Sequence, residues 1–155
     1  MEFFISITQE RMPSSRVLYM RRTGEYGSEN YRLMDTFKKW VKESNLYDED
    51  SVIYAAAMDN PAITEPCQCR YDVCISQLEN QIPACDPVKC RELEGGKYLI
   101  FLIPHTAEAV ENAWKMWPSE LEKTGYLWDN SRPVMERYRR NLVDNHYCEL
   151  CIPVL

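Results

Sequence analysis

One acidic residue near the end of the chain stands among residue types that recognise cations. Side chains alternate between the two faces of a β-strand, so a strand over residues 134–139 would place Val134, Glu136 and Tyr138 on one face. A carboxylate beside aromatic rings attracts a cation by its charge, and each ring face adds about 0.5–2 kcal/mol of cation–π attraction. This pattern favours a site for flat, cationic, aromatic ligands.

Two simpler interpretations of Glu136 stay open. Glutamate is seldom buried, so this carboxylate could be solvated, or it could pair with Arg137 or Arg139. The whole chain carries a negative net charge. The basic run Arg137, Arg139 and Arg140 is therefore interpreted as the solvated end of a strand.

The cysteines are the main alternative source of chemistry. The Cys148-x-x-Cys151 and Cys67-x-Cys69 spacings are similar to those of metal sites. Residues three apart on a strand point to opposite faces, however, so Cys148 and Cys151 could not readily share one ion. The chain has only two histidines to complete such a site. We therefore expect no metal and no other cofactor. The thiols that are most open to reaction lie in the predicted connectors: Cys67, Cys85 and Cys90.

The sequence lacks the common motifs of nucleophilic and phosphoryl-transfer catalysis. It contains no Gly-x-Ser-x-Gly elbow and no glycine-rich phosphate loop, and neither His105 nor His146 stands in a Ser/His or Cys/His pattern. No catalytic residue is assigned, and an enzymatic function is not favoured.

Length and charge exclude several classes of protein. The 155 residues suit one domain, and no segment approaches the ~20 apolar residues that a membrane span needs. No export signal is present at the N-terminus, so we expect a cytoplasmic protein. The net charge is −6 and the pI is about 5.0, which repels phosphate backbones. Direct binding to nucleic acid is therefore not expected.

Two helices can be predicted from apolar residues at steps of three and four. They cover residues 28–45 and 106–123. Ser28 and Thr106 are the expected N-caps, and Gly125 is the expected end of the second helix. Pro118 removes a backbone donor inside this helix and predicts a kink or a break there.

Eight short segments rich in β-branched and aromatic residues predict strands. Glu94-Gly95-Gly96 predicts a tight hairpin turn between two of them. The predicted strands cover residues 3–8, 17–22, 52–58, 71–76, 88–93, 97–103, 134–139 and 147–154.

The order of these elements indicates a duplication. Residues 71–75 resemble residues 148–152, at an offset of 77 residues. Trp40 recurs as Trp117 and Phe37 as Trp114 at the same offset. One shared offset in both a helix and a strand favours an internal repeat over chance.

Several short segments, in their order and spacing, resemble the GyrI-like (gyrase-inhibitor-like) small-molecule-binding domain, which is also the effector-binding half of some AraC-type and MerR-type regulators. They are residues 21–24, 69–75, 95–98, 113–114, 133–138 and 149–154. The resemblance implies one α+β domain over residues 1–155. It would be built from duplicated βαββ units, about residues 1–80 and 86–155, with pseudo-twofold symmetry. Their antiparallel sheets would form a concave ligand groove with the two main helices.

The resemblance also implies a ligand site. Regulators of this family bind bulky, often cationic, aromatic compounds, and they use a carboxylate at the position of Glu136 within aromatic walls. The candidate walls are Trp114, Tyr98, Tyr138 and Tyr147. Core packing is the commoner role for such rings, and the preference for Trp114 over Trp117 rests on the resemblance.

Three functions stay open. The first is a stand-alone protein that senses or sequesters hydrophobic, cationic aromatic compounds through Glu136. The second is a hydrolase of electrophilic xenobiotics that uses the same aromatic cage. The third is a module that modulates a topoisomerase or a transcription regulator, and a homodimer is compatible with each. No DNA-binding segment stands before residue 1, so a direct role as a transcription factor is not expected.

Overall fold

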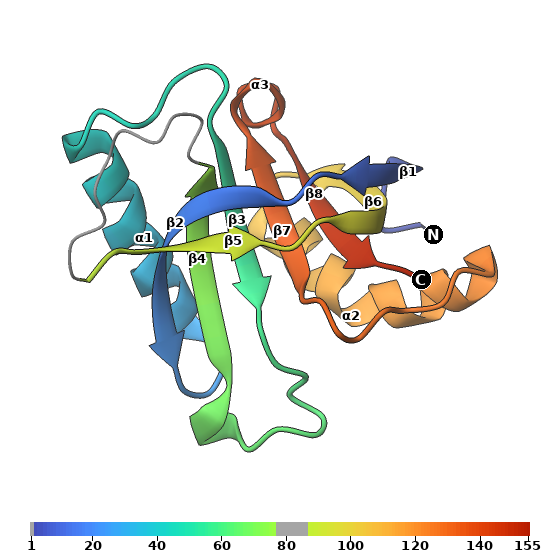
Figure 1. Ribbon diagram of the computed structural model, residues 1–155. Coiled ribbons are helices and arrows are strands. Elements are labelled where there is room, and N and C mark those ends of the chain that lie inside the picture. The colour runs from blue at the N-terminus through green and yellow to red at the C-terminus, as the bar shows by residue number, and fades with distance from the viewer. Residues whose placement is uncertain (1, 77–86) are drawn as a thin grey trace.

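The strands of the chain form one continuous antiparallel sheet (Figure 1). The computed structural model describes residues 2–76 and 87–155. The eight strands found in these ranges are β1 (Ser6–Met12), β2 (Ser15–Thr23), β3 (Val52–Ala57), β4 (Arg70–Ser76), β5 (Lys89–Leu93), β6 (Gly96–Pro104), β7 (Val134–Arg139) and β8 (Tyr147–Pro153). The helices of the same ranges are α1 (Ser28–Glu43), α2 (Ala107–Thr124), the short α3 (Arg140–Val143) and the 3₁₀ turn η1 (Pro66–Gln68).

The strand order shows the duplication. It runs β1-β6-β8-β7-β3-β4-β2-β5, and all neighbours are antiparallel. If each strand from β1 to β4 is exchanged with the strand four places later in the chain, the strand order of the sheet becomes its own reverse. The two halves therefore meet at the β3–β7 pair, and β1 and β5 each extend the other half. The predicted α+β architecture with pseudo-twofold symmetry is confirmed. The two halves share a single sheet, whereas separate sheets were expected.

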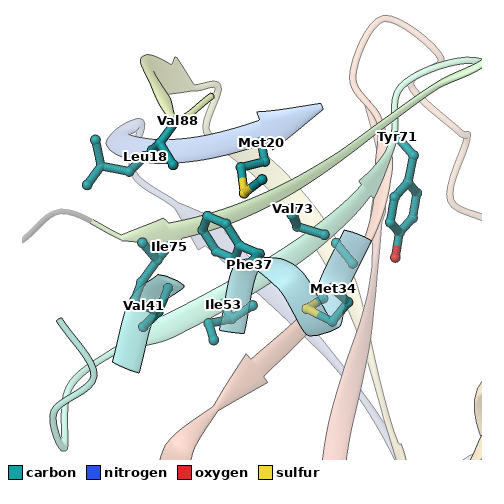
Figure 2. Packing of buried hydrophobic residues seen from close by; sticks show 11 residues of the cluster. Leu18, Met20, Met34, Phe37, Val41, Ile53, Tyr71, Val73, Ile75 and Val88 are labelled. Carbon is teal, nitrogen blue, oxygen red and sulfur yellow. The ribbon is translucent and has the colours of Figure 1, made fainter. Parts of the chain in front are cut away.

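Each half of the sheet carries one amphipathic helix on the same face. Met34, Phe37 and Val41 of α1 pack on side chains of β2, β3 and β4. Figure 2 shows Phe37 near the middle of this cluster, close to Met20 and Val73. In the other half, α2 places three side chains on β6 and β8: Ala113, Trp117 and Leu121. A third cluster, on the opposite face of the sheet, is formed by alternate residues of the same strands.

Two buried acids on that opposite face are held by arginines. Asp72 is fully buried and accepts from Arg21 at 2.6 Å and from Arg91 at 2.8 Å. Its counterpart 77 residues on is Glu149, which accepts from Arg137 and Arg139 at 2.9 Å. The basic run on β7 was interpreted as a solvated strand end, and this is wrong for Arg137, which is 4% exposed. Strand alternation turns Arg137 towards Glu149 and away from water.

Local signals at the two helices were partly wrong. The helix α2 continues through Pro118, because Trp117 and Leu121 pack on the sheet on either side of the missing donor. The N-cap of α1 is Gly27, and Ser28 is already helical. Thr106 caps α2 as predicted by accepting from the backbone N–H of Ala109 at 3.1 Å.

The predicted hairpin at residues 94–96 is also wrong. In the structure β5 pairs with β2, whereas β6 pairs with β1 and β8. A Cβ at Gly95 would stand 2.3 Å from the backbone oxygen of Met12, so glycine is needed where the chain passes the end of β1. The connector predicted around Cys85 lies outside the described residues.

The buried pairs make a prediction about stability. Replacing Asp72 by Asn would leave two arginines facing a neutral amide, which we expect to lower the free energy of unfolding by about 3–5 kcal/mol. Urea denaturation would measure this loss. The control is Glu29→Gln, because the Glu29–Arg32 pair on α1 is exposed and should contribute less than about 1 kcal/mol. Equal losses in the two variants would contradict the structural role of Asp72.

Candidate functional site

Glu136 lies near the centre of the sheet. It is in the middle of β7, where its neighbours in register are Ala55 of β3 and Leu150 of β8. Its side chain lies on the face that carries both helices, as strand alternation predicted, together with Val134 and Tyr138. Tyr138 packs against the clusters under both α1 and α2. The carboxylate therefore lies where the two halves of the fold meet.

Two neutral donors hold the Glu136 carboxylate. The indole Nε1 of Trp114, on α2, donates to Oε2 at 2.7 Å. The hydroxyl of Tyr138 donates to Oε1. The residue is partly exposed, and among the described residues no lysine or arginine forms an ion pair with it within 4.0 Å. We call Glu136, Trp114 and Tyr138 the carboxylate site.

Burial dominates the electrostatics of this site. Removal from water raises the pKa of the Glu136 carboxyl, and the hydrogen bonds from Tyr138 and Trp114 and the charge of Lys38 offset only part of that rise. Burial also raises the pKa of the Tyr138 hydroxyl, and the neighbouring negative charge of Glu136 adds to this rise. The carboxylate is therefore held at a cost in stability, because Lys38 offsets only part of its lost hydration and no basic side chain of the described residues forms an ion pair with it.

A small pocket adjoins the carboxylate site and shares Tyr138 as a wall. Its volume is about 190 Å³. The side chains of Lys38, Lys42, Tyr47 and His105 also line it, above an apolar floor made by Val41, Ile53 and Val143. The ring of His105 lies 5.3 Å from that of Tyr138, and the Lys38 ammonium lies 5.9 Å from the centre of the Tyr138 ring. We call this the lysine-rimmed pocket.

A larger open cleft lies at the ends of β3 and β7. It measures about 560 Å³ and is lined by polar and charged side chains, among them Glu49, Asp50 and Arg140. No aromatic ring of the described residues lines it, and small-molecule sites are mostly apolar. The smaller pocket beside Glu136 is therefore the better candidate for a hydrophobic ligand, although the cleft is larger.

The structure brings together three of the five predicted site residues: Glu136, Tyr138 and Trp114. Tyr98 is fully buried in the cluster on the opposite face, where its hydroxyl donates to the backbone oxygen of Glu94 and the Arg132 guanidinium covers its ring. Tyr147 begins β8 on the face of Glu149, away from α2. Because side chains alternate between the faces of a strand, Tyr98 and Tyr147 point to the face opposite Glu136.

Three residues around the carboxylate site were missed by the sequence reasoning: Lys38 and Tyr71, which interact electrostatically with Glu136, and His105, which lies beside Tyr138. The charge of Glu136, together with burial, raises the pKa of the Tyr71 hydroxyl. Burial and the charge of Lys38 lower the pKa of His105. Alternation with Val73 and Ile75 could have placed Tyr71 on the helix face, but its nearness to Glu136 depends on the register across β4, β3 and β7.

The two tryptophans of α2 divide between core and site. Trp117 is 9% exposed and packs edge-to-face on Trp128 at 5.3 Å. Trp114, one turn earlier, is partly exposed and reaches Glu136. The expectation that at least one of the pair belongs to the core is confirmed.

The described cysteines do not form a metal site. Cys148 belongs to the cluster under α2 and Cys151 to the cluster on the opposite face, as strand geometry predicted. Within residues 2–76 and 87–155, no three His, Cys, Asp or Glu side chains gather as metal ligands would. In the same ranges no helix is both long and apolar enough to span a membrane.

The fold has two pseudo-symmetric halves that meet at the β3–β7 pair, beside Glu136. The chain belongs to the family of the GyrI-like small molecule binding domain, which matches residues 6–155.

Relatives and solved structures agree with this assignment. The SPbeta prophage-derived protein YosT of Bacillus subtilis (strain 168), named provisionally as a transcriptional regulator, is 40% identical over 151 residues, which are 97% of this chain and 99% of YosT. A crystal structure of the EcmrR C-terminal domain has a TM-score of 0.72 at 12% identity and covers 97% of both chains. The structure of SAV2435 bound to tetraphenylphosphonium has a TM-score of 0.65 at 12% identity, over 97% of this chain and 94% of SAV2435. At 12% identity these two structures show the fold alone.

The raised pKa of Glu136 makes a prediction about stability. Above this pKa the buried charge costs stability, and the cost disappears as the pH falls towards the pKa of the unfolded chain. We therefore expect Glu136→Gln to melt at a higher temperature than the wild type at pH 8, by about 2–4 °C for each kcal/mol of relieved cost, with a smaller difference at pH 5. Thermal melts at the two pH values would measure this.

The matched control is Glu122→Gln, which changes an exposed glutamate on α2 and should leave the melting temperature nearly unchanged at both pH values. A Glu136→Gln variant that melts below the wild type at pH 8 would show that the ionised carboxylate stabilises the fold.

Proposed function

We propose that this protein senses or sequesters bulky, hydrophobic, cationic aromatic compounds, and that the carboxylate site between α1 and α2 recognises their charge. One observation carries the proposal. The Glu136 carboxylate is held by two neutral donors, and in the described part of the chain no basic side chain forms an ion pair with it. The other two acids of the central strands, Asp72 and Glu149, each have two arginines.

The surroundings of Glu136 suit a cation that carries rings. The faces of Trp114 and Tyr138 each offer about 0.5–2 kcal/mol of cation–π attraction, more when water is displaced. A ligand cation would also restore the favourable interactions that burial takes from the carboxylate. Tetraphenylphosphonium, which is bound to the structurally similar SAV2435, is a compound of this type, and its presence there supports the choice of ligand class.

Tetraphenylphosphonium and the neutral triphenylphosphine oxide, which carries an oxygen in place of one phenyl ring, would test charge recognition. We expect the cation to bind wild-type protein with a Kd in the micromolar range, which is about −8 kcal/mol, and the neutral compound to bind at least about tenfold more weakly. Glu136→Gln should weaken binding of the cation about tenfold and leave the neutral compound unchanged. Isothermal titration calorimetry at pH 8 would measure both.

The pH dependence provides the control. Tetraphenylphosphonium is a permanent cation, so only the protein titrates, and its affinity should fall as the pH drops through the raised pKa of Glu136. The Glu136→Gln variant should show no such fall. Equal affinity for the two compounds, or an unchanged Kd in Glu136→Gln, would remove the carboxylate from the proposal.

A hydrolytic function is the second candidate, favoured by the direct hydrogen bond between Tyr138 and Glu136. The carboxylate could take a proton from water while the tyrosine hydroxyl supplies one to the opening electrophile, an arrangement worth about 10²–10⁴-fold in rate. Mass spectrometry of styrene oxide after incubation would separate the candidates. We expect unchanged compound, whereas addition of water that is lost in Glu136→Gln would favour hydrolysis.

A further inference from the structure

The lysine-rimmed pocket has the opposite charge to the carboxylate site beside it. Lys38 and Lys42 both line it from α1, one helical turn apart. The described residues that surround the pocket include no carboxylate. Neither lysine forms an ion pair within residues 2–76 and 87–155. Two lysines therefore line a largely apolar cavity, and neither is neutralised by an ion pair with a described acid, although Lys38 is close enough to Glu136 to lower the pKa of its carboxyl.

The size and lining of the pocket suit one ring that carries an acid. A cavity of about 150 Å³ holds one benzene molecule, so about 190 Å³ has room for a ring with one substituent. Val41, Ile53 and Val143 supply apolar contacts for such a ring, and the ring of Tyr138 supplies a stacking face. Burial and the charge of Lys38 lower the pKa of His105, so the positive charge of the lining comes mainly from the two lysines. The two lysines at the rim would then meet the acid group of the ligand.

The two sites share one wall. Tyr138 lines the pocket with its ring and binds Glu136 through its hydroxyl. A ligand that contacts the Tyr138 ring could therefore reach Glu136 with a cationic part and the lysines with an acidic part. A lipophilic cation without an acid would use only one of the two sites, and its charge would be repelled by Lys38.

We propose that the lysine-rimmed pocket is an anion subsite for the carboxylate of an aryl group, and that the preferred ligands of this protein are aromatic zwitterions. Their cationic ring system lies at Glu136, and their aryl carboxylate lies between Lys38 and Lys42. This inference rests on the proposed function, because it adds a second charged contact to the same ligand.

Rhodamine B and its ethyl ester test the subsite directly. Both carry the same cationic ring system, and they differ only in whether the pendant phenyl ring bears a free carboxylate. Fluorescence anisotropy at pH 8 should show that wild-type protein binds the acid about 3- to 10-fold more tightly than the ester, as two ion pairs at an exposed rim would give. The double variant Lys38→Met with Lys42→Met should bind the acid no more tightly than the ester.

The control is Lys39→Met, which removes an exposed lysine of α1 that does not line the pocket. It should keep the preference for the acid. All three lysines are exposed, so the variants should fold as the wild type does, and circular dichroism would verify this.

The outcomes separate the subsite from the proposed function. Equal binding of the acid and the ester by wild-type protein would overturn the subsite, and so would a preference for the acid that persists in the double variant. In either case, binding of the ester that depends on Glu136 would still support the cation site. Binding of the acid alone, lost in the double variant, would support the subsite and overturn the cation site. Failure of both dyes to bind would overturn both.

Discussion

The antiparallel pairing of β3 with β7 is the constraint on which the rest of the molecule depends. It joins two halves that each carry one helix, and it sets Ala55 beside Glu136 at the middle of the sheet. Because both helices lie on the same face, the side chains of β7 on that face stand between them. Tyr138, which packs on both clusters, and Trp114, which reaches across from α2, then hold one carboxylate where the halves meet.

The acids on the two faces of the sheet have different partners. On the face away from the helices, Asp72 and Glu149 occupy corresponding places in the repeats and are neutralised by arginines. On the helix face, the donors that the described part of the chain places within hydrogen-bond distance of Glu136 are both neutral. Removing one partner of a buried ion pair is costly, so Asp72 and Glu149 are tied to their arginines, whereas Glu136 has no such partner among the described residues. A pseudo-symmetric scaffold thus carries an asymmetric arrangement of acids.

The neighbouring lysines add a second aspect to this asymmetry. In a domain of the GyrI-like family, a carboxylate site and a pocket of opposite charge share the ring of Tyr138. Under the proposed function, the ligand would be selected by the distance and sign of two charges as well as by its hydrophobic surface.

The sequence by itself determined the elements, their repetition and the face on which Glu136 lies, because periodicity records local geometry and burial. It also separated Cys148 from Cys151 by the same rule. Only the tertiary structure decided which residues meet. Tyr98 and Tyr147 turned to the other face, Arg137 became buried, and Lys38 and His105 came to the ring of Tyr138 from distant segments. Such contacts depend on strand register and on how helices cross the sheet, which arise from packing between segments far apart in the chain and leave no local pattern.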